Sequence, residues 1–166
     1  MNNVSSTYGT LANVNNGVSG ARYLAADGHT IVSLTQTSHT GNNYTFSDGL
    51  GGAINVTATI NGVTTTSNVG TYASGVSNTN SGTTLSGGNF NNVFTNNGSY
   101  NVTPATLTIA GNSVTRTYDG TNFAPTNSNF TTTGFMNGEN SSTIGGLTFN
   151  GNAANSRNSG SYTFGS

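Results

Sequence analysis

Gly, Asn, Thr and Ser make up about 100 of the 166 residues, a bias that largely limits this chain to strands and turns. Gly, Asn and Ser are poor helix formers, so we expect almost no helix. The apolar residues are mainly Val, Ile, Leu, Phe and Tyr, and they stand between Thr and Ser in short runs, as in half-buried strands. Because only 31% of the residues are hydrophobic, the core must be thin. The sequence therefore predicts an all-β fold.

A β-hairpin is the clearest predicted element. Residues 53–60 alternate between apolar and polar side chains, and Asn61-Gly62 separates them from a second run at residues 63–67. Asn-Gly between two such runs favours a type I′ turn, because both residues accept a positive φ. One face of the first strand then carries four apolar residues: Ile54, Val56, Ala58 and Ile60. Further short strands are expected at residues 30–37, 71–74, 92–95, 100–103, 105–110, 114–118, 130–135, 147–149 and 162–164.

Three tyrosines, Tyr72, Tyr100 and Tyr162, each end a copy of the motif Asn-x-Gly-(Ser/Thr)-Tyr and lie in a predicted strand. The Gly lets the chain turn sharply into the strand. The ring can then pack while its hydroxyl reaches a backbone group, as in the tyrosine corner of immunoglobulin sandwiches. The simpler alternative is a turn followed by an aromatic strand residue. We expect these tyrosines to be structural.

A longer-range repeat divides the chain. Residues 7–10, Thr-Tyr-Gly-Thr, are echoed about 110 residues later by residues 117–121, which contain Tyr118, Asp119 and Gly120. The sequence therefore predicts two tandem units, residues 1–104 and 105–166, joined near Pro104. Many short strands separated by turn residues indicate that each unit is a β-sandwich.

Four stretches in combination, residues 97–109, 117–121, 134–139 and 158–162, resemble the mostly bacterial Ig-like and Tyr-Asp-Gly repeat domains of filamentous-haemagglutinin-like secreted adhesins. The resemblance is concentrated in residues 96–166. It implies tandem Ig-like antiparallel β-sandwich repeats. The alternative fold is a β-solenoid, which would need a short regular coil repeat that the sequence does not show.

Compared with that family, both units are incomplete. The first lacks the strand that should precede Tyr8, and the second is truncated at its C-terminal strands. A missing strand leaves unpaired backbone groups that can pair with another chain. We therefore expect either association by strand exchange, with residues 105–110 as the natural donor, or an unstable second unit. The exposed side should include some of four apolar residues: Leu107, Ile109, Phe149 and Phe164.

Charged residues make up 4% of the chain, and none is Lys. Nucleic-acid binding needs a basic patch, which three scattered Arg residues cannot form. No apolar run approaches the roughly 20 residues that span a bilayer, so we expect no membrane insertion. The segment Met1–Gly9 lacks the features of a signal peptide, so an export signal would lie outside this chain. There is no Cys to form a disulfide.

Catalytic, metal and cofactor sites are not expected. Asp27, Asp48 and Asp119 each precede a Gly and could ligate calcium, but an Asp-Gly turn explains each of them better. His29 and His39 supply at most half of a zinc site. The chain has neither a nucleophile elbow nor a phosphate-binding loop, and its four acids offer little for acid–base chemistry.

These observations favour a non-enzymatic structural stalk or spacer in a secreted bacterial surface adhesin, located outside the cell and contacting neighbouring repeats of the same protein. Two alternatives stay open. One is a self-assembling extracellular fibre subunit that uses strand exchange between its own copies. The other is an adhesive module that binds cell-surface glycans through Tyr and Asn side chains.

Overall fold

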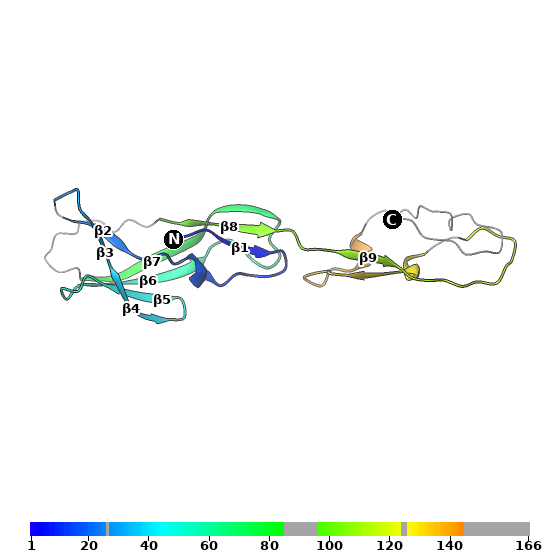
Figure 1. Ribbon diagram of the computed structural model, residues 1–166, viewed down its shortest axis with the longest axis horizontal. Coiled ribbons are helices and arrows are strands. Elements are labelled where there is room, and N and C mark those ends of the chain that lie inside the picture. The colour runs from blue at the N-terminus through cyan, green and yellow to red at the C-terminus, as the bar shows by residue number, and fades with distance from the viewer. Residues whose placement is uncertain (26, 85–95, 124–125, 145–166) are drawn as a thin grey trace. The chain divides into compact units, whose positions relative to one another are not determined.

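The computed structural model describes residues 1–25, 27–84, 96–123 and 126–144 (Figure 1). The predicted strands at 92–95, 147–149 and 162–164, together with Tyr162, Phe149 and Phe164, lie outside the described residues. The chain divides into two compact units, Met1–Pro104 and Ala105–Ser166. The described residues contain strands and short 3-10 helices but no α-helix, which confirms the all-β prediction for them.

Unit 1 is built on one mixed six-stranded sheet with the strand order β1-β8-β7-β6-β5-β4. Its strands are β1 (Val4–Thr7), β4 (Thr35–Thr40), β5 (Asn43–Ser47), β6 (Ala53–Ile60), β7 (Gly70–Thr84) and β8 (Gly98–Thr103). β1 and β8 are parallel and all other neighbours are antiparallel. A second, two-stranded sheet joins β2 (Arg22–Leu24) to β3 (Ile31–Ser33). Strands β4 to β8 form a meander of antiparallel neighbours, which differs from a solenoid. The parallel β1–β8 pair departs from the purely antiparallel sheet that the sequence predicts.

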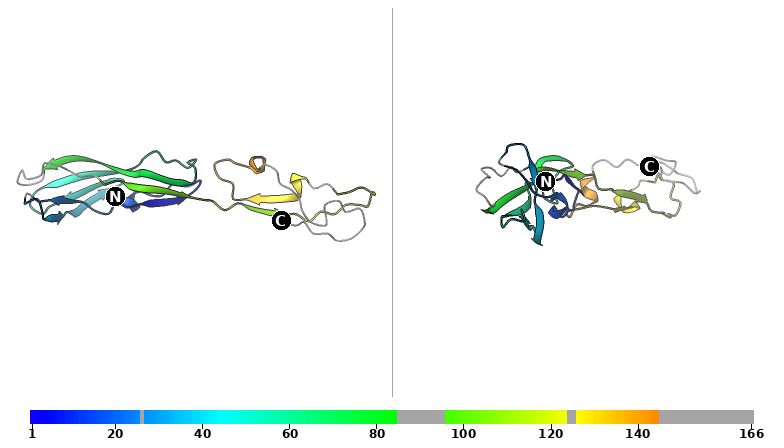
Figure 2. Two further views of the ribbon diagram at one scale, coloured as in Figure 1. Left: turned by 90° about the horizontal axis from the view of Figure 1, so that it is seen from above. Right: turned by 60° about the vertical axis from the view of Figure 1, so that its left-hand side comes forward.

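The core of unit 1 lies on the inner face of the curled sheet (Figures 1 and 2). Alternation along β6 buries Ile54, Val56 and Ala58, as predicted. The covering layer is an irregular segment with the 3-10 helix η1 (Val14–Gly17), joined by Val63, in place of a second large sheet. The complete set of buried core residues is Val4, Val14, Tyr44, Phe46, Ile54, Val56, Ala58, Val63, Val76, Tyr100 and Val102.

A backbone irregularity in β7 accompanies the curl. The register between β7 and β8 shifts between Tyr72 and Val76, and Ser74 within this interval has φ +57°. Bulges of this kind increase local twist and bend a strand. The next residue, Gly75, lies so close to β8 that an added Cβ would come within 2.6 Å of the Tyr100 Cβ. A residue without a side chain is therefore required where β7 crosses Tyr100.

The predicted hairpin at Asn61-Gly62 is wrong beyond its first strand. β6 ends at Ile60 as expected, but its partner is β7, with Ile60 opposite Val76. Gly62 has φ +68° whereas Asn61 does not have a positive φ, so no type I′ turn forms. The physical reason is burial: Val63 enters the core, and the Asn61 amide donates to the Gly75 carbonyl at 2.8 Å. Residues 63–67 form a turn in place of a return strand.

A two-residue hairpin does occur, at Gly41-Asn42 between β4 and β5. Gly41 has φ +57°, as the first turn residue of such hairpins often requires. β5 itself, with the pattern Asn-Tyr-Thr-Phe-Ser, was not among the strands expected. β1 was not expected either, and it places a strand directly before Tyr8.

The outer face of the sheet is polar and carries cross-strand pairs in which a Thr hydroxyl donates to an Asn side-chain oxygen. None of the six strands contains Asp, Glu, Lys or Arg. Pairs of this kind add modest stability across a sheet. Three of them join register partners: Thr57 to Asn43 (2.6 Å), Thr45 to Asn55 (2.9 Å) and Thr71 to Asn101 (3.1 Å).

In the described part of unit 2, β9 (Thr108–Gly111) pairs antiparallel with β10 (Phe130–Thr133), beside the short 3-10 helices η2 (Asn127–Asn129) and η3 (Ser141–Thr143). The expected strand at 114–118 does not form. Phe130 is buried, whereas Leu107 and Ile109 are 41% and 43% exposed, as expected for this side of the unit. An isolated strand pair is only marginally stable.

Replacing Val76 with Ala should lower the free energy of unfolding by about 2 kcal/mol, because it removes two buried methyl groups and leaves a cavity. Val76 is fully buried, whereas Val69 is 54% exposed, so Val69→Ala is the matched control and should change stability by less than about 0.5 kcal/mol. Urea unfolding followed by circular dichroism measures both. Equal losses in the two variants would contradict this placement of the core.

Candidate functional site

Tyr100 in β8 is the side chain around which unit 1 closes. It is fully buried, and its hydroxyl accepts a hydrogen bond from the Ala12 amide at 2.7 Å and donates to the Ser6 hydroxyl at 2.8 Å. The Ser6 hydroxyl in turn donates to the Thr10 carbonyl at 2.8 Å. A single relay of hydrogen bonds therefore connects the last strand of the unit, its first strand and the segment that covers the core.

The glycine of the Tyr100 motif serves a different purpose from the one predicted. Gly98 is the first residue of β8, and an added Cβ there would lie 2.0 Å from the Asn2 carbonyl oxygen. The Asn3 side chain also accepts a hydrogen bond from the Ser99 amide at 2.9 Å. Gly98 is therefore needed because the backbone at Asn2, just before β1, comes very close to β8. No sharp turn forms at Gly98.

Tyr72 lies in β7 directly opposite Tyr100. Its half-buried ring packs against the core, and its hydroxyl donates to the Asn68 carbonyl four residues upstream at 2.8 Å. This is the contact that defines a tyrosine corner, in which the ring packs and the hydroxyl reaches back to the chain. Two of the three motif tyrosines thus meet on adjacent strands.

All three Asp-Gly pairs form turns closed by the Asp side chain, as the sequence predicted. The Oδ1 atom of Asp27 accepts from the His29 amide at 2.9 Å, that of Asp48 from the Leu50 amide at 2.8 Å, and that of Asp119 from the Thr121 amide at 2.8 Å. The following glycines have φ values of +72°, +75° and +72°. Each carboxylate therefore stabilises its own turn.

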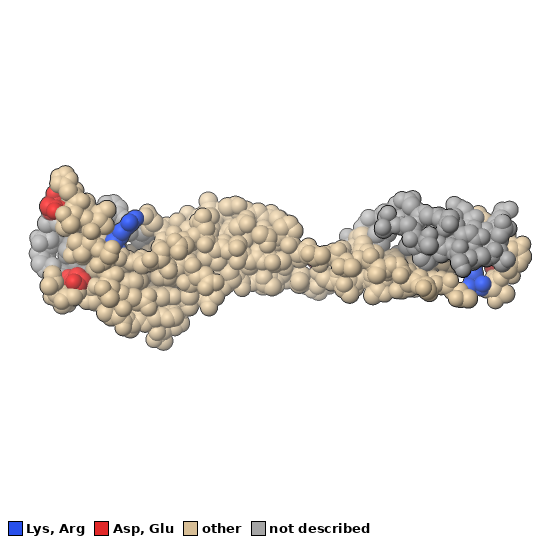
Figure 3. All heavy atoms as spheres, in the orientation of Figure 1, with Lys and Arg blue, Asp and Glu red and all other residues tan. Residues whose placement is uncertain are grey.

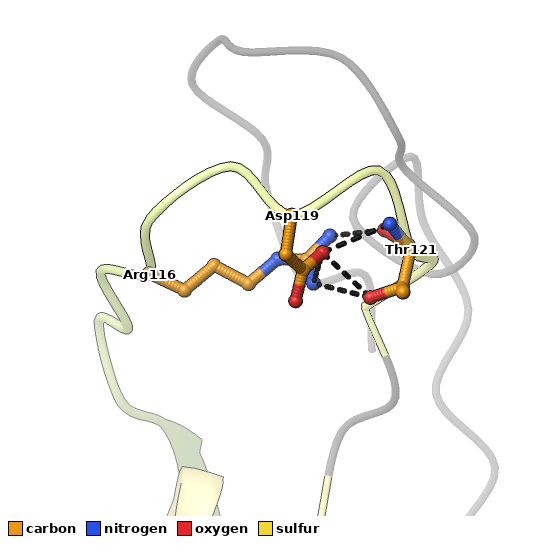
Figure 4. A network of polar contacts seen from close by, with 3 residues as sticks. All are labelled: Arg116, Asp119 and Thr121. Carbon is orange, nitrogen blue, oxygen red and sulfur yellow. Dashed lines mark hydrogen bonds and ion pairs between the residues drawn. The ribbon is translucent and has the colours of Figure 1, made fainter.

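The Asp119 turn carries an additional clamp (Figure 4). Arg116 Nη1 lies 3.2 Å from Asp119 Oδ1, and its Nη2 donates to the Thr121 carbonyl at 2.5 Å. Hydrogen bonds from the hydroxyl and then the amide of Thr121, with the Arg116 charge adding to them, hold the pKa of Asp119 below its ordinary value of 3.8. Gly120 completes the turn, while Tyr118 beside it is 66% exposed. The structure thus gathers Tyr118, Asp119 and Gly120 into one loop of unit 2.

The histidines have structural partners. His39 stacks on Tyr44 with ring centroids 4.4 Å apart, and its Nε2 lies 2.6 Å from the Gly41 carbonyl. His29 follows the Asp27 turn. Among the described residues no three His, Asp or Glu side chains come together as metal ligands would. The same residues contain no helix long and apolar enough to cross a membrane.

Exposed aromatic rings and charges are few on the described surface. Tyr44 and Tyr100 are buried, and Tyr8, Tyr23 and Tyr72 are half-buried, which leaves Tyr118 as the exposed tyrosine of the described residues. The face seen in Figure 3 is mostly uncharged. In unit 1 the charged side chains lie off the six-stranded sheet, at Arg22, Asp27 and Asp48.

No protein-family model matches the chain, and no curated protein or solved structure matches it.

The most important partners of Tyr100, Ser6 and Ala12, were not anticipated from the sequence. Ser6 lies 94 residues from Tyr100, so no local pattern connects them. The sequence signal that bears on them is the partial recurrence of residues 2–8 before Tyr118, which points to this segment without identifying its partners.

Tyr100→Phe should lower the free energy of unfolding by about 1–3 kcal/mol, because it leaves the part-buried Ala12 amide without its acceptor. Tyr72→Phe removes one exposed hydrogen bond and should cost about 1 kcal/mol or less. Urea unfolding of both variants measures the difference. The Tyr100 relay would be refuted by equal losses.

The Asp119 turn should persist down to about pH 4 and loosen at lower pH. Because the folded-state pKa is lowered, the stabilisation is present above the unfolded value of 3.8 and is lost as the pH falls through the folded pKa. Carbon NMR of the carboxyl groups measures this midpoint. Thr121→Val keeps the amide but removes the hydroxyl donor, so the Asp119 midpoint should rise; an unchanged midpoint would contradict this cause.

Proposed function

We propose that this chain is a structural stalk or spacer from a secreted bacterial surface adhesin. The observation that carries the proposal is the parallel pairing of the first and last strands of unit 1. The Met1 amino group donates to the Asn96 carbonyl before β8 begins, and the Tyr8 amide donates to the Thr103 carbonyl where β8 ends. The unit therefore begins and finishes at opposite ends of this strand pair.

Entry and exit of the chain at opposite ends of the β1–β8 pair suit a repeat in an array. An antiparallel pair of first and last strands would return the chain to the end where it entered, whereas a parallel pair carries it through. Pro104 follows β8 and disfavours the helical conformation at Thr103, which suits the extended end of a strand. Repeats connected in this way can each contact their neighbours and act as a spacer.

The chemistry of the surface agrees with an extracellular role. The six-stranded sheet presents hydroxyl and amide groups without formal charge, and Asn and Thr side chains hydrogen bond to each other across it. The resemblance of residues 96–166 to Ig-like adhesin repeats gives independent sequence support for the adhesin assignment. Each unit would then be an Ig-like repeat.

A fibre subunit that assembles by strand exchange is the second candidate. In the described part of unit 2, β9 has a partner only in β10, and Leu107 and Ile109 are exposed next to and within β9. An exposed apolar strand of this kind can add to another sheet. Light scattering of the purified chain distinguishes the open-ended assembly of a fibre subunit from a spacer that stays monomeric or dimeric. The glycan-binding alternative has less support, since Tyr118 is the one exposed tyrosine available for stacking among the described residues.

On this proposal, one, two and three copies of the chain joined in tandem increase in maximum dimension by equal steps, because unit 1 of each copy carries the chain from one end of the β1–β8 pair to the other. Small-angle X-ray scattering measures these dimensions directly. A maximum dimension that grows more slowly than the number of copies would overturn the spacer proposal. Specific binding on a glycan array would favour the adhesive module in its place.

A further inference from the structure

The edge of β8 that holds β1 is a specific site for one short segment. β1 pairs with β8 alone in the sheet, in the register Val4 to Tyr100 and Thr7 to Thr103. The Val4 side chain is 6% exposed and lies in the core. These contacts require an apolar residue at the first position of the segment.

The third residue of the segment is selected by a hydrogen bond. The Ser6 hydroxyl accepts a hydrogen bond from the Tyr100 hydroxyl and donates one to the Thr10 carbonyl. A backbone contact adds to it, since the Thr103 hydroxyl donates to the Ser6 carbonyl at 3.2 Å. The site therefore recognises a small hydroxyl residue two positions after an apolar one.

Unit 2 contains a second copy of this segment that lacks the selected residue. Residues 112–118, Asn-Ser-Val-Thr-Arg-Thr-Tyr, share four of seven positions with residues 2–8, Asn-Asn-Val-Ser-Ser-Thr-Tyr. They carry Arg116 where unit 1 has Ser6, and Ser113 where unit 1 has Asn3. Arg has no hydrogen-bond acceptor, and its charge is costly to place in a half-buried site. In the structure this copy is not a strand, and Val114 is 41% exposed.

We propose that the β8 edge is a docking site for β1 of a second copy of this chain, so that two copies associate by exchanging Val4–Thr7. The exchanged strand makes the same contacts as the resident one, which makes association inexpensive. β1, β8 and their sheet neighbours carry no charge, so two copies do not repel each other at this edge. The matching segment of unit 2 is excluded by Arg116.

The segment after β1 provides a hinge. Gly9 has φ +89°, and the turn at this point is closed by hydrogen bonds from the Thr10 amide (3.0 Å) and hydroxyl (2.8 Å) to the Thr7 carbonyl. Opening this turn releases β1 together with Ser6 while Ala12 remains with its own unit. This inference does not depend on the spacer proposal, because a stalk and a fibre subunit could both exchange β1.

Disulfide trapping tests the exchange, since the chain has no native Cys. Ser5 and Asn101 are register partners in β1 and β8, so a Ser5→Cys/Asn101→Cys chain can be oxidised within one copy or between two exchanged copies. The chain is unfolded, refolded at about 10 µM or about 1 mM, and then oxidised. A tethered segment has an effective concentration in the millimolar range, so exchange between copies competes with closure within one copy only at the higher protein concentration. Non-reducing electrophoresis then separates monomers from covalent dimers.

The matched control is Asn43→Cys/Thr57→Cys, which joins β5 to β6 across a short loop. We expect this control to stay monomeric at both concentrations, whereas the β1–β8 pair gives several-fold more covalent dimer at the higher concentration. The same amount of dimer from both pairs would overturn the proposal, as would a β1–β8 pair that is monomeric throughout.

Adding Ser6→Arg to the β1–β8 pair tests the recognition itself. This change gives residues 2–8 the Arg of the unit 2 copy, and we expect it to abolish the covalent dimers. Circular dichroism checks that the other five strands still fold. A variant that folds and forms undiminished dimers would show that Ser6 does not select the docked strand.

Discussion

The hydrogen bonds at the Tyr100 hydroxyl are the interaction on which unit 1 depends. β8 meets two segments from the start of the chain there: β8 supplies the ring, β1 supplies Ser6, and the covering segment supplies the Ala12 amide. A buried hydroxyl with both a donor and an acceptor satisfied is stabilising, whereas the same group without partners is costly. The relay therefore links the first strand and the covering segment to β8 through one buried hydroxyl.

Small residues make that arrangement possible. Gly75 lets β7 pass over the Tyr100 side chain, and Gly98 lets the backbone at Asn2 approach β8. On the other side of the core, a Cβ added to Gly17 in η1 would come within 2.8 Å of the Val76 side chain. Glycines at these three positions therefore let backbone segments pack closely around a core with few side chains.

Features with local causes could be predicted from the sequence. Alternation over residues 53–60 gave the bounds of β6 and its buried face, and each Asp-Gly turn closes within two residues. The Asn61-Gly62 hairpin failed because burial of Val63 outweighed the turn preference of that dipeptide. β1 was missed because it has a single apolar residue, and its partner Tyr100 lies far away in the chain. The structural role of Tyr100 could be predicted, but its partners Ser6 and Ala12 could not.

The parallel pairing of β1 with β8 also determines how unit 1 responds to mechanical force. A pull between the first and last residues of the unit acts along both strands, in opposite directions, at the one place where they are joined. The hydrogen bonds of the pair are then loaded together in shear, whereas an antiparallel pair pulled from one end would open one bond at a time. Forced unfolding is governed by the unfolding rate, which here depends on breaking these hydrogen bonds together. This rate is separate from equilibrium stability. A unit with a small core can in this way still resist tension along the chain.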